Sequence, residues 1–351
     1  MSILRHIHAL TAVLMLALAA GRAAAQSPAD RAAIIPDTSV QHAHLRRPAY
    51  LQAGDTVAVV STSGRVSDDF DTLRVQRLFD SWGLHTKFGR HATDTAQPYF
   101  AGTDSQRASD LQQAIDDPSV KAVIACRGGY GAVRLLPEVD FGPLFIHPKW
   151  IVGFSDITLL HLVMQRAGIE SIHGPMPATF GFDDEGCADP SAESLREALF
   201  GELQRIEVEP HPLNRTGHAE GRLAGGNLMM LCSAAGTPEA LRCDEPTVLF
   251  VEEVGEAAYR IDRMMQQLLR SGALDNVTAI VAGYLTDTKY MDTFGVESPC
   301  EIIDEYARLL GIPALYGLPA GHELPNTALY LGRRVQVDIT DDGASITFIE
   351  D

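Results

Sequence analysis

The sequence has 351 residues, of which 46% are hydrophobic, and a formal net charge of −18 at pH 7. A chain of this length is longer than one hydrophobic core usually serves, so we expect two domains. The acidic balance argues against nucleic acid and anionic membrane surfaces as partners, but it leaves small cationic or zwitterionic ligands open.

The first residues have the pattern of a secretory signal peptide. Arg5 precedes an apolar run at residues 9–20, and the alanines at 23–25 are typical of a signal-peptidase site. The run is shorter than the roughly 20 residues that a membrane span needs. We therefore predict a signal peptide over residues 1–25, cleavage after Ala25, and an exported, periplasmic protein with no membrane segment after processing. The alternative is an uncleaved anchor.

Residues 26–47 are small, polar and basic, which predicts a linker. Strand and helix patterns then alternate and predict an N-terminal α/β domain over residues 48–200. Its mainly parallel sheet would be built from right-handed crossovers and flanked by helices. The strands are expected at 56–61, 84–88, 122–126 and 150–154, and the helices at 68–82 and 104–115 and directly after 155. Functional sites in such sheets lie outside the carboxyl ends of the strands.

The alternation weakens beyond this domain, and residues 201–220, rich in Pro, Asn, His and Gly, are predicted as an interdomain connection. A smaller α+β domain is expected over residues 221–351. Its strands are predicted at 247–251 and 277–282, its helices at about 258–269 and 300–310, and a closing hairpin at 334–349. The five cysteines show no paired spacing, and H-E-x-x-H is absent, so neither a metal nor another cofactor is expected.

Ser155 lies where the apolar strand at 150–154 meets a helix. A hydroxyl at this turn is close to the positive end of the helix dipole and its free N–H groups, where negative charge can be stabilised. Serine followed by Asp156 at the first helical position is also the pattern of a plain helix N-cap. The turn alone therefore leaves nucleophile and cap open.

An activated serine needs a base and a carboxylate that orients the base. His322 is the candidate base, because it lies in a loop punctuated by glycine and proline. Glu252 is the candidate acid at the end of an apolar strand, and strand alternation points Glu253 to the other face. The alternatives are an exposed loop histidine, and glutamates that face solvent or pair with Arg260 or Arg263.

The loop Arg127-Gly-Gly-Tyr-Gly131 follows a buried strand. Its two adjacent glycines let backbone amides approach a ligand closely, but the loop matches neither nucleotide-binding glycine motif. An oxyanion hole would need one amide from Gly128 or Gly129 and another from Asp156. The alternative is a tight glycine turn. Candidate substrate-binding residues are Arg127, which could equally fix its own loop, and Tyr130.

Together these segments resemble the LD-carboxypeptidases, the serine peptidases of family S66, in which a Ser-Glu-His triad replaces Ser-His-Asp. The matching segments lie in family order and spacing and cover roughly residues 48–335. They are Arg127-Gly-Gly-Tyr-Gly131, Gly153-Phe-Ser-Asp-Ile-Thr158, His173-Gly-Pro-Met176, Gly225-Gly-Asn-Leu228, Val251-Glu-Glu-Val-Gly-Glu256, Tyr259-Arg-Ile-Asp-Arg-Met264 and Gly321-His322.

The resemblance implies Ser155 as nucleophile, Glu252 as acid and His322 as base. It also implies oxyanion donors at the amides of Asp156 and of Gly128 or Gly129. Aspartate usually follows the family's acid, whereas Glu253 follows here, which leaves the choice between the two glutamates open. The family further suggests a site between the two domains, and homodimers are frequent in it.

The implied activity is hydrolysis of the L,D-peptide bond in peptidoglycan tetrapeptide stems, with release of D-alanine through an acyl-enzyme. Its partner would be a small peptide or muropeptide. One alternative is a hydrolase similar to the microcin-immunity branch, which cuts a peptidyl- or aminoacyl-nucleotide amide. A second is a wall-peptide binding protein without turnover. An ordinary α/β-hydrolase is disfavoured, because Ile157 stands where its G-x-S-x-G elbow has glycine.

Overall fold

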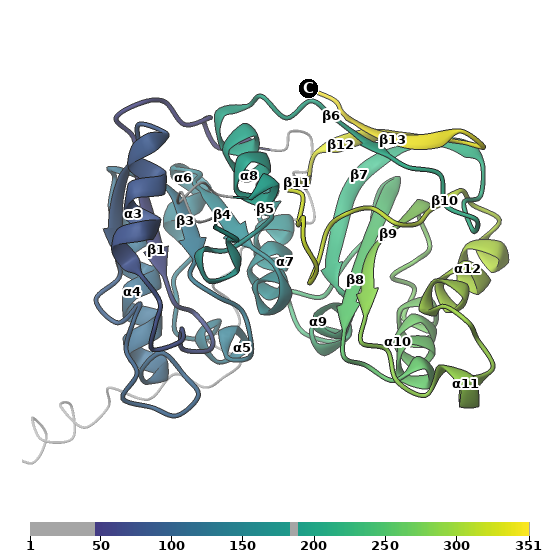
Figure 1. Cartoon of the computed structure of the whole chain (residues 1–351), viewed down its shortest axis with the longest axis horizontal. Helices are drawn as coiled ribbons and strands as arrows, with labels where there is room; N and C mark the ends of the chain where they lie inside the picture. Colours follow the sequence, from purple (N-terminus) through teal and green to yellow (C-terminus); the bar gives the residue numbers. More distant parts are fainter. Residues whose placement is uncertain (1–45, 183–188, 351) are drawn as a thin grey trace, which may run out of the picture. The chain divides into compact units, whose positions relative to one another are not determined.

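The computed structural model describes residues 46–182 and 189–350, which form two sheets flanked by helices (Figure 1). The predicted signal peptide, its cleavage point after Ala25 and residues 26–45 of the predicted linker lie outside the described residues. Within the described part of the chain, no helix has the length and apolar character needed to cross a membrane.

The first sheet has six strands in the order β11-β5-β4-β3-β1-β2. Five run parallel: β1 (Thr56–Val60), β2 (His85–Phe88), β3 (Val120–Ala125), β4 (Trp150–Gly153) and β5 (Ser171–His173). All five residues of β1 are buried, as expected for a parallel strand covered on both faces. The helices of this half are α3 (Thr72–Ser81), α4 (Asp104–Asp116), α5 (Ala132–Leu135), α6 (Gly142–Ile146), α7 (Thr158–Arg166) and α8 (Pro190–Phe200).

The second sheet has seven strands in the order β10-β9-β8-β7-β12-β13-β6. They are β6 (Arg205–Val208), β7 (Gly217–Asn227), β8 (Thr247–Val254), β9 (Val277–Thr286), β10 (Ala314–Leu315), β12 (Arg334–Thr340) and β13 (Gly343–Phe348). Strands β7 to β10 are parallel, and β12, β13 and β6 add antiparallel pairs.

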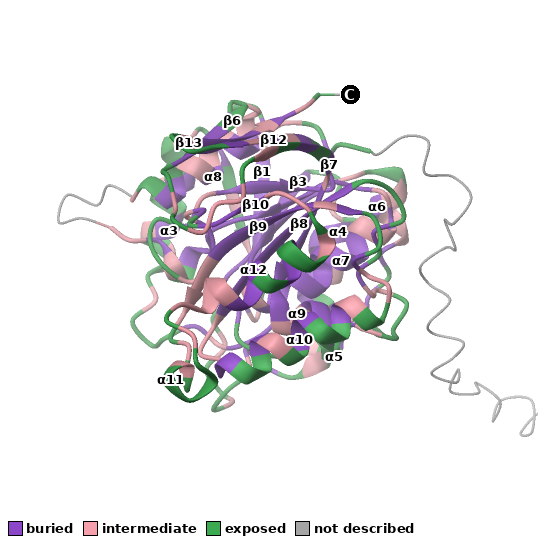
Figure 2. Ribbon diagram, turned by 90° about the vertical axis from the view of Figure 1, so that its right-hand side faces the viewer, coloured by how far each residue is buried: buried purple, intermediate pink, exposed green. Residues whose placement is uncertain are grey.

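Helices cover the second sheet with their apolar faces. They are α9 (Leu228–Ser233), α10 (Ala258–Arg270) and α12 (Pro299–Leu310), whereas the short helix α11 (Met291–Phe294) has no buried residue. In α10 the buried residues recur at helical spacing, at Ala258, Ile261, Met265 and Leu268. Figure 2 shows β8 and β9 buried, with exposed residues on the outer sides of α10 and α12. The predicted α/β fold class is confirmed: the first sheet is mainly parallel, and the second combines parallel strands β7 to β10 with antiparallel pairs.

Two strands cross the predicted domain limits. The segment 201–220, predicted as a connection, contains β6 and the first four residues of β7, and both belong to the second sheet. Strand β11 (Leu329–Leu331), predicted within the C-terminal domain, pairs antiparallel with β5 of the first sheet. Strands β6 and β11 are short and gain their backbone partners from distant segments, so local composition favours a loop there.

The crossing strand β11 is held by a buried ion pair. Arg333, just after β11, donates to Glu170, just before β5, with 2.5 Å between Nη2 and Oε2. The two side chains are only 2% and 8% exposed, and the Arg333 guanidinium lies 3.6 Å from the Tyr330 ring centroid. One apolar cluster also includes residues of both sheets, among them Trp150 and Phe250. The sheets therefore share a core.

Candidate active site

Ser155 stands at a tight turn between β4 and a short 3-10 helix, η2 (Ser155–Ile157). Its φ of +63° makes it one of three non-glycine residues with positive φ in the described ranges. Such a conformation costs about 1–3 kcal/mol and persists where the surroundings enforce it, often at functional sites. Ser155 does not act as an N-cap, because neither η2 nor α7 has a side-chain cap.

The side chain of Asp156 ties together the loops around Ser155. Its Oδ2 accepts a hydrogen bond from Ser63 Oγ at 2.5 Å and one from the Ala132 amide at 2.8 Å. Ser63 follows β1, and Ala132 begins α5 after the glycine loop. The carboxyl is 1% exposed, and its burial raises the pKa of Asp156 above the usual range. The Asp156 carboxyl thus links the loops that follow β1, β3 and β4. These contacts also hold the backbone amide of Asp156 in place.

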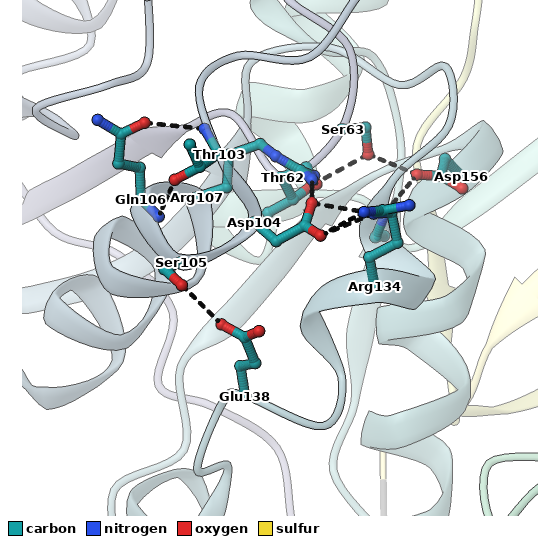
Figure 3. Close-up of polar contacts among 11 residues, drawn as sticks. Thr62, Ser63, Thr103, Asp104, Ser105, Gln106, Arg107, Arg134, Glu138 and Asp156 are labelled. Atoms are coloured by element: carbon teal, nitrogen blue, oxygen red, sulfur yellow. Dashed lines mark hydrogen bonds and ion pairs between the residues drawn. The ribbon is translucent and has the colours of Figure 1, made fainter.

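A fully buried arginine contacts the loop that follows β1 (Figure 3). Arg107 of α4 is 0% exposed, donates to the carbonyl of Thr62 and pairs with Asp104. Sequence reasoning gave no role to Arg107 or to the Asp156 side chain. Arginine is rarely buried completely, and the spacing of α4 contains no local signal for it.

Gly128 borders Ser155 more closely than Gly129 does. A Cβ built on Gly128 would lie 3.0 Å from Ser155 Cβ and 3.3 Å from its Oγ, whereas one on Gly129 would approach Tyr99 Oη and Gly64. Gly128 is buried, and its carbonyl accepts from the Gly64 amide at 3.2 Å. Of the two predicted oxyanion residues, Gly128 is therefore the neighbour of the serine.

We expect Gly128→Ala to lower kcat about 10- to 100-fold, because the added methyl displaces the Ser155 side chain and misplacement by about 1 Å can cost 10²-fold. The measurement is kcat on the tetrapeptide stem that the family resemblance implies as substrate, with Tm from calorimetry. Gly174→Ala is the matched control, since its methyl would meet Ile172 and Ala328 at ordinary contact distances of 3.4 and 3.5 Å. Equal kcat for the two variants would contradict the expectation.

Glu252 and His322 form a hydrogen-bonded pair. Glu252, on β8, is 0% exposed, and its Oε2 lies 2.6 Å from His322 Nδ1. Its Oε1 has no hydrogen-bond partner among the described residues. The His322 ring packs edge-on against Phe154, 4.9 Å between centroids, so the imidazole lies beside the residue that precedes Ser155. The structure thus brings Glu252 and His322 together and places the imidazole against the residue that precedes Ser155.

The charge state of His322 reflects two opposing effects. Burial lowers the pKa of the imidazole, but the hydrogen bond and the negative charge of Glu252 more than offset this, so the net pKa lies above its usual 6.5. His173, by contrast, is 0% exposed between Phe154 and Phe250. Burial holds the pKa of His173 well below 6.5, so this imidazole is neutral.

The second glutamate has different partners. Glu253 accepts hydrogen bonds from Asn227 and from the amides of Met229 and Val254. Neither glutamate takes part in the alternative arginine pairs: Arg260 pairs with Glu256 at 3.3 Å. The arginine over the Tyr259 ring is Arg263. The geometry therefore favours Glu252 as the partner of His322.

The two candidate substrate-binding residues lie at the glycine loop. Arg127 Nη1 donates to the Arg65 carbonyl at 2.8 Å, which joins this loop to the segment after β1. Tyr130 is 46% exposed, and its ring lies 6.0 Å from that of Phe100. Arg127 thus fixes its loop, and the Tyr130 ring is open to solvent.

The chain was compared with known proteins. Residues 57–174 match the LD-carboxypeptidase N-terminal domain, and residues 220–337 match the LD-carboxypeptidase C-terminal domain. The murein tetrapeptide carboxypeptidase of Pseudomonas aeruginosa is 34% identical over 285 residues, which are 79% of this chain and 91% of the relative. The chain belongs to the LD-carboxypeptidase family.

Solved structures agree with this LD-carboxypeptidase assignment. The muramoyltetrapeptide carboxypeptidase from Oxalobacter formigenes superposes with a TM-score of 0.74 at 29% identity, covering 84% of this chain and 99% of its own. The microcin C7 self-immunity protein MccF of Escherichia coli is a more distant relative, 26% identical over 85% of this chain and 94% of its own. The predicted family and the serine-type carboxypeptidase class are confirmed.

Proposed function

We propose that this LD-carboxypeptidase releases the terminal D-alanine from peptidoglycan tetrapeptide stems, using Ser155 as nucleophile, His322 as base and Glu252 as orienting acid. The observation that carries the proposal is the Glu252–His322 hydrogen bond of 2.6 Å, made beside the strained turn of Ser155. A base held by a carboxylate next to a serine hydroxyl is the arrangement that activates serine.

The first half-reaction forms an acyl-enzyme. His322 Nε2 takes the proton of Ser155 Oγ while this oxygen attacks the carbonyl carbon of the L,D-peptide bond. The resulting oxyanion accepts hydrogen bonds from the amides of Asp156 and Gly128, of which each is worth about 10²–10³ in turnover. When the C–N bond breaks, His322 gives its proton to the leaving amine of D-alanine.

The second half-reaction restores the enzyme. His322 takes a proton from a water molecule, the hydroxide oxygen attacks the acyl carbon, and the proton returns to Ser155 Oγ as the ester bond breaks. Throughout, Glu252 accepts a hydrogen bond from the Nδ1–H group of His322, which keeps Nε2 directed at the reacting atoms. The negative charge of Glu252 stabilises the imidazolium that forms in both steps.

The names of two relatives support this substrate. The Pseudomonas aeruginosa relative is a murein tetrapeptide carboxypeptidase, and the Oxalobacter formigenes structure is a muramoyltetrapeptide carboxypeptidase. The signal pattern over residues 1–25 would export the enzyme to the periplasm, where peptidoglycan stems are present. Export and a homodimer remain predictions.

The test is release of alanine from a disaccharide tetrapeptide, followed by mass spectrometry of the shortened stem and chiral chromatography of the free amino acid. We expect free D-alanine and a tripeptide stem. The control substrate is the same stem ending in L-alanine, which should stay intact. No release of D-alanine would overturn the proposed substrate.

A second candidate function is hydrolysis of an aminoacyl-nucleotide amide, favoured by the relationship to MccF. The same protein preparation can be offered a peptidyl-adenylate analogue. In this compound a peptidyl group is joined to adenosine through an amide, and a group that resists hydrolysis replaces the phosphate. Cleavage of this analogue, together with intact tetrapeptide, would favour the second function.

A further inference from the structure

The nucleophile's helix contacts the second sheet through Thr158, three residues after Ser155. Thr158 begins α7, is 0% exposed, and its Oγ1 accepts the Asn227 amide at 3.0 Å. Asn227 is the last residue of β7. The preceding Gly226 has a φ of +140°, and a Cβ there would lie 2.6 Å from Thr158 Oγ1. Glycine is thus required for this close approach.

Asn227 passes the contact on to Glu253. Its Nδ2 donates to Glu253 Oε1 at 3.2 Å, and in the sheet Asn227 pairs with Glu252. Glu253 is 4% exposed and also accepts the amides of Met229 at 2.7 Å and Val254 at 2.9 Å. A continuous path of hydrogen bonds therefore runs from the helix after Ser155 to the residue next to Glu252.

We propose that Glu253 is a positioning residue, which through Asn227 and Thr158 holds the helix of Ser155 in a fixed position relative to Glu252 and His322. The inference rests on the triad proposed above. Ser155 follows a strand of the first sheet and Glu252 lies in the second, so the distance between them depends on how the sheets are joined. Glu252 and Glu253 point to opposite faces of β8. The end of this strand therefore orients His322 through Glu252 and contacts Asn227 through Glu253.

The chemistry of Glu253 fits a geometric role. All three of its hydrogen-bonded partners are N–H donors, which only the carboxylate form satisfies completely. Burial raises the pKa of Glu253 to about 7, and the neighbouring charge of Glu252 adds to this, while the three hydrogen bonds oppose it. An apolar residue at this position would avoid the cost of burying a carboxyl group, but it could not order three donors.

The test compares kcat and KM of two single variants. Glu253→Gln places an amide donor among the three N–H groups, and Thr158→Val removes the acceptor of the Asn227 amide at equal volume. For each we expect kcat to fall about 10- to 100-fold, with KM within about threefold. Thr158→Ser keeps the acceptor oxygen and should restore kcat to within about threefold. Circular dichroism and Tm show whether each variant folds.

A double variant separates a shared path from two independent defects. If Glu253 and Thr158 act through one path, Glu253→Gln with Thr158→Val has the kcat of the worse single variant, within about threefold. Multiplied effects, or a changed KM with unchanged kcat, would overturn the inference. If Glu253→Gln fails to fold, the two Thr158 variants still test the inference: equal kcat for Thr158→Val and Thr158→Ser would by itself overturn it.

Failure of this inference is distinguishable from failure of the triad. Wild-type kcat in both single variants, with an inactive Ser155→Ala enzyme, would overturn the positioning role and leave the triad standing. An active Ser155→Ala enzyme would instead overturn the triad on which the positioning role depends.

Discussion

Ser155→Ala is expected to lower kcat for D-alanine release by at least about 10⁴-fold, because the substitution removes the atom that we propose forms the acyl-enzyme. In serine peptidases, loss of the nucleophile costs about 10⁶ in kcat, and the remaining rate comes from binding and the oxyanion donors. The contacts of Asp156 with Ser63 and Ala132 involve other atoms, so we expect the fold and Tm to be retained.

The measurement is kcat on the disaccharide tetrapeptide, combined with labelling by a fluorophosphonate. The wild-type protein should gain the probe's mass on the peptide that contains Ser155, and the variant should not. Ser233→Ala is a matched control, since this exposed serine donates to the Met229 carbonyl at the surface of α9. Residual activity above about 1% in Ser155→Ala would contradict the nucleophile assignment.

Glu252→Gln is expected to lower kcat about 10³- to 10⁴-fold. The amide of glutamine keeps the shape of the side chain but can hold the wrong tautomer of His322, as replacement of the triad carboxylate does in other serine peptidases. It also removes the negative charge that stabilises the imidazolium. Both effects act on the chemical step, so KM should change much less than kcat.

The same variant should change the pH profile. His322 must be neutral to accept the serine proton, so wild-type kcat/KM should fall as the pH drops through its raised pKa, with a midpoint above 6.5. Without the carboxylate, burial still lowers the pKa of His322 and nothing offsets it fully, so the acid limb should move to lower pH.

Profiles between about pH 5 and pH 9 measure this shift. The control is Glu323→Gln, which removes an exposed charge next to His322 in the chain, and solvent screening should keep its shift small. An unchanged acid limb in Glu252→Gln would contradict the assigned role of the pair.

The sequence pattern predicts much of the candidate site, because local rules apply to the strand ends and loops that form it. Alternating strands and helices predict a parallel sheet, and the carboxyl ends of β1, β3 and β4 then place Ser63, Gly128 and Ser155 at one edge. The strand-to-turn position of Ser155 and the loop around His322 follow from apolar runs and from glycine and proline, which act on the neighbouring backbone.

Features that depend on partners distant in the sequence could be identified only from the tertiary structure. Strand β11 joins the first sheet through pairing with β5 and the buried Arg333–Glu170 pair, and neither partner is near in sequence. Gly128 and Gly129 are equivalent in the sequence, yet one borders Ser155 and the other borders Tyr99.

The local sequence predicts the turn at Ser155, where strand meets helix. It does not predict which side chains surround this turn. A carboxylate such as Asp156, Glu252 or Glu253 has the same local signature whether it faces solvent or lies buried. Its role depends on desolvation and on which donors the fold brings within about 3 Å, and these come from segments far apart in the chain. Local periodicity therefore determines at which position of a strand, helix or turn a residue lies, and tertiary packing determines what its side chain contacts.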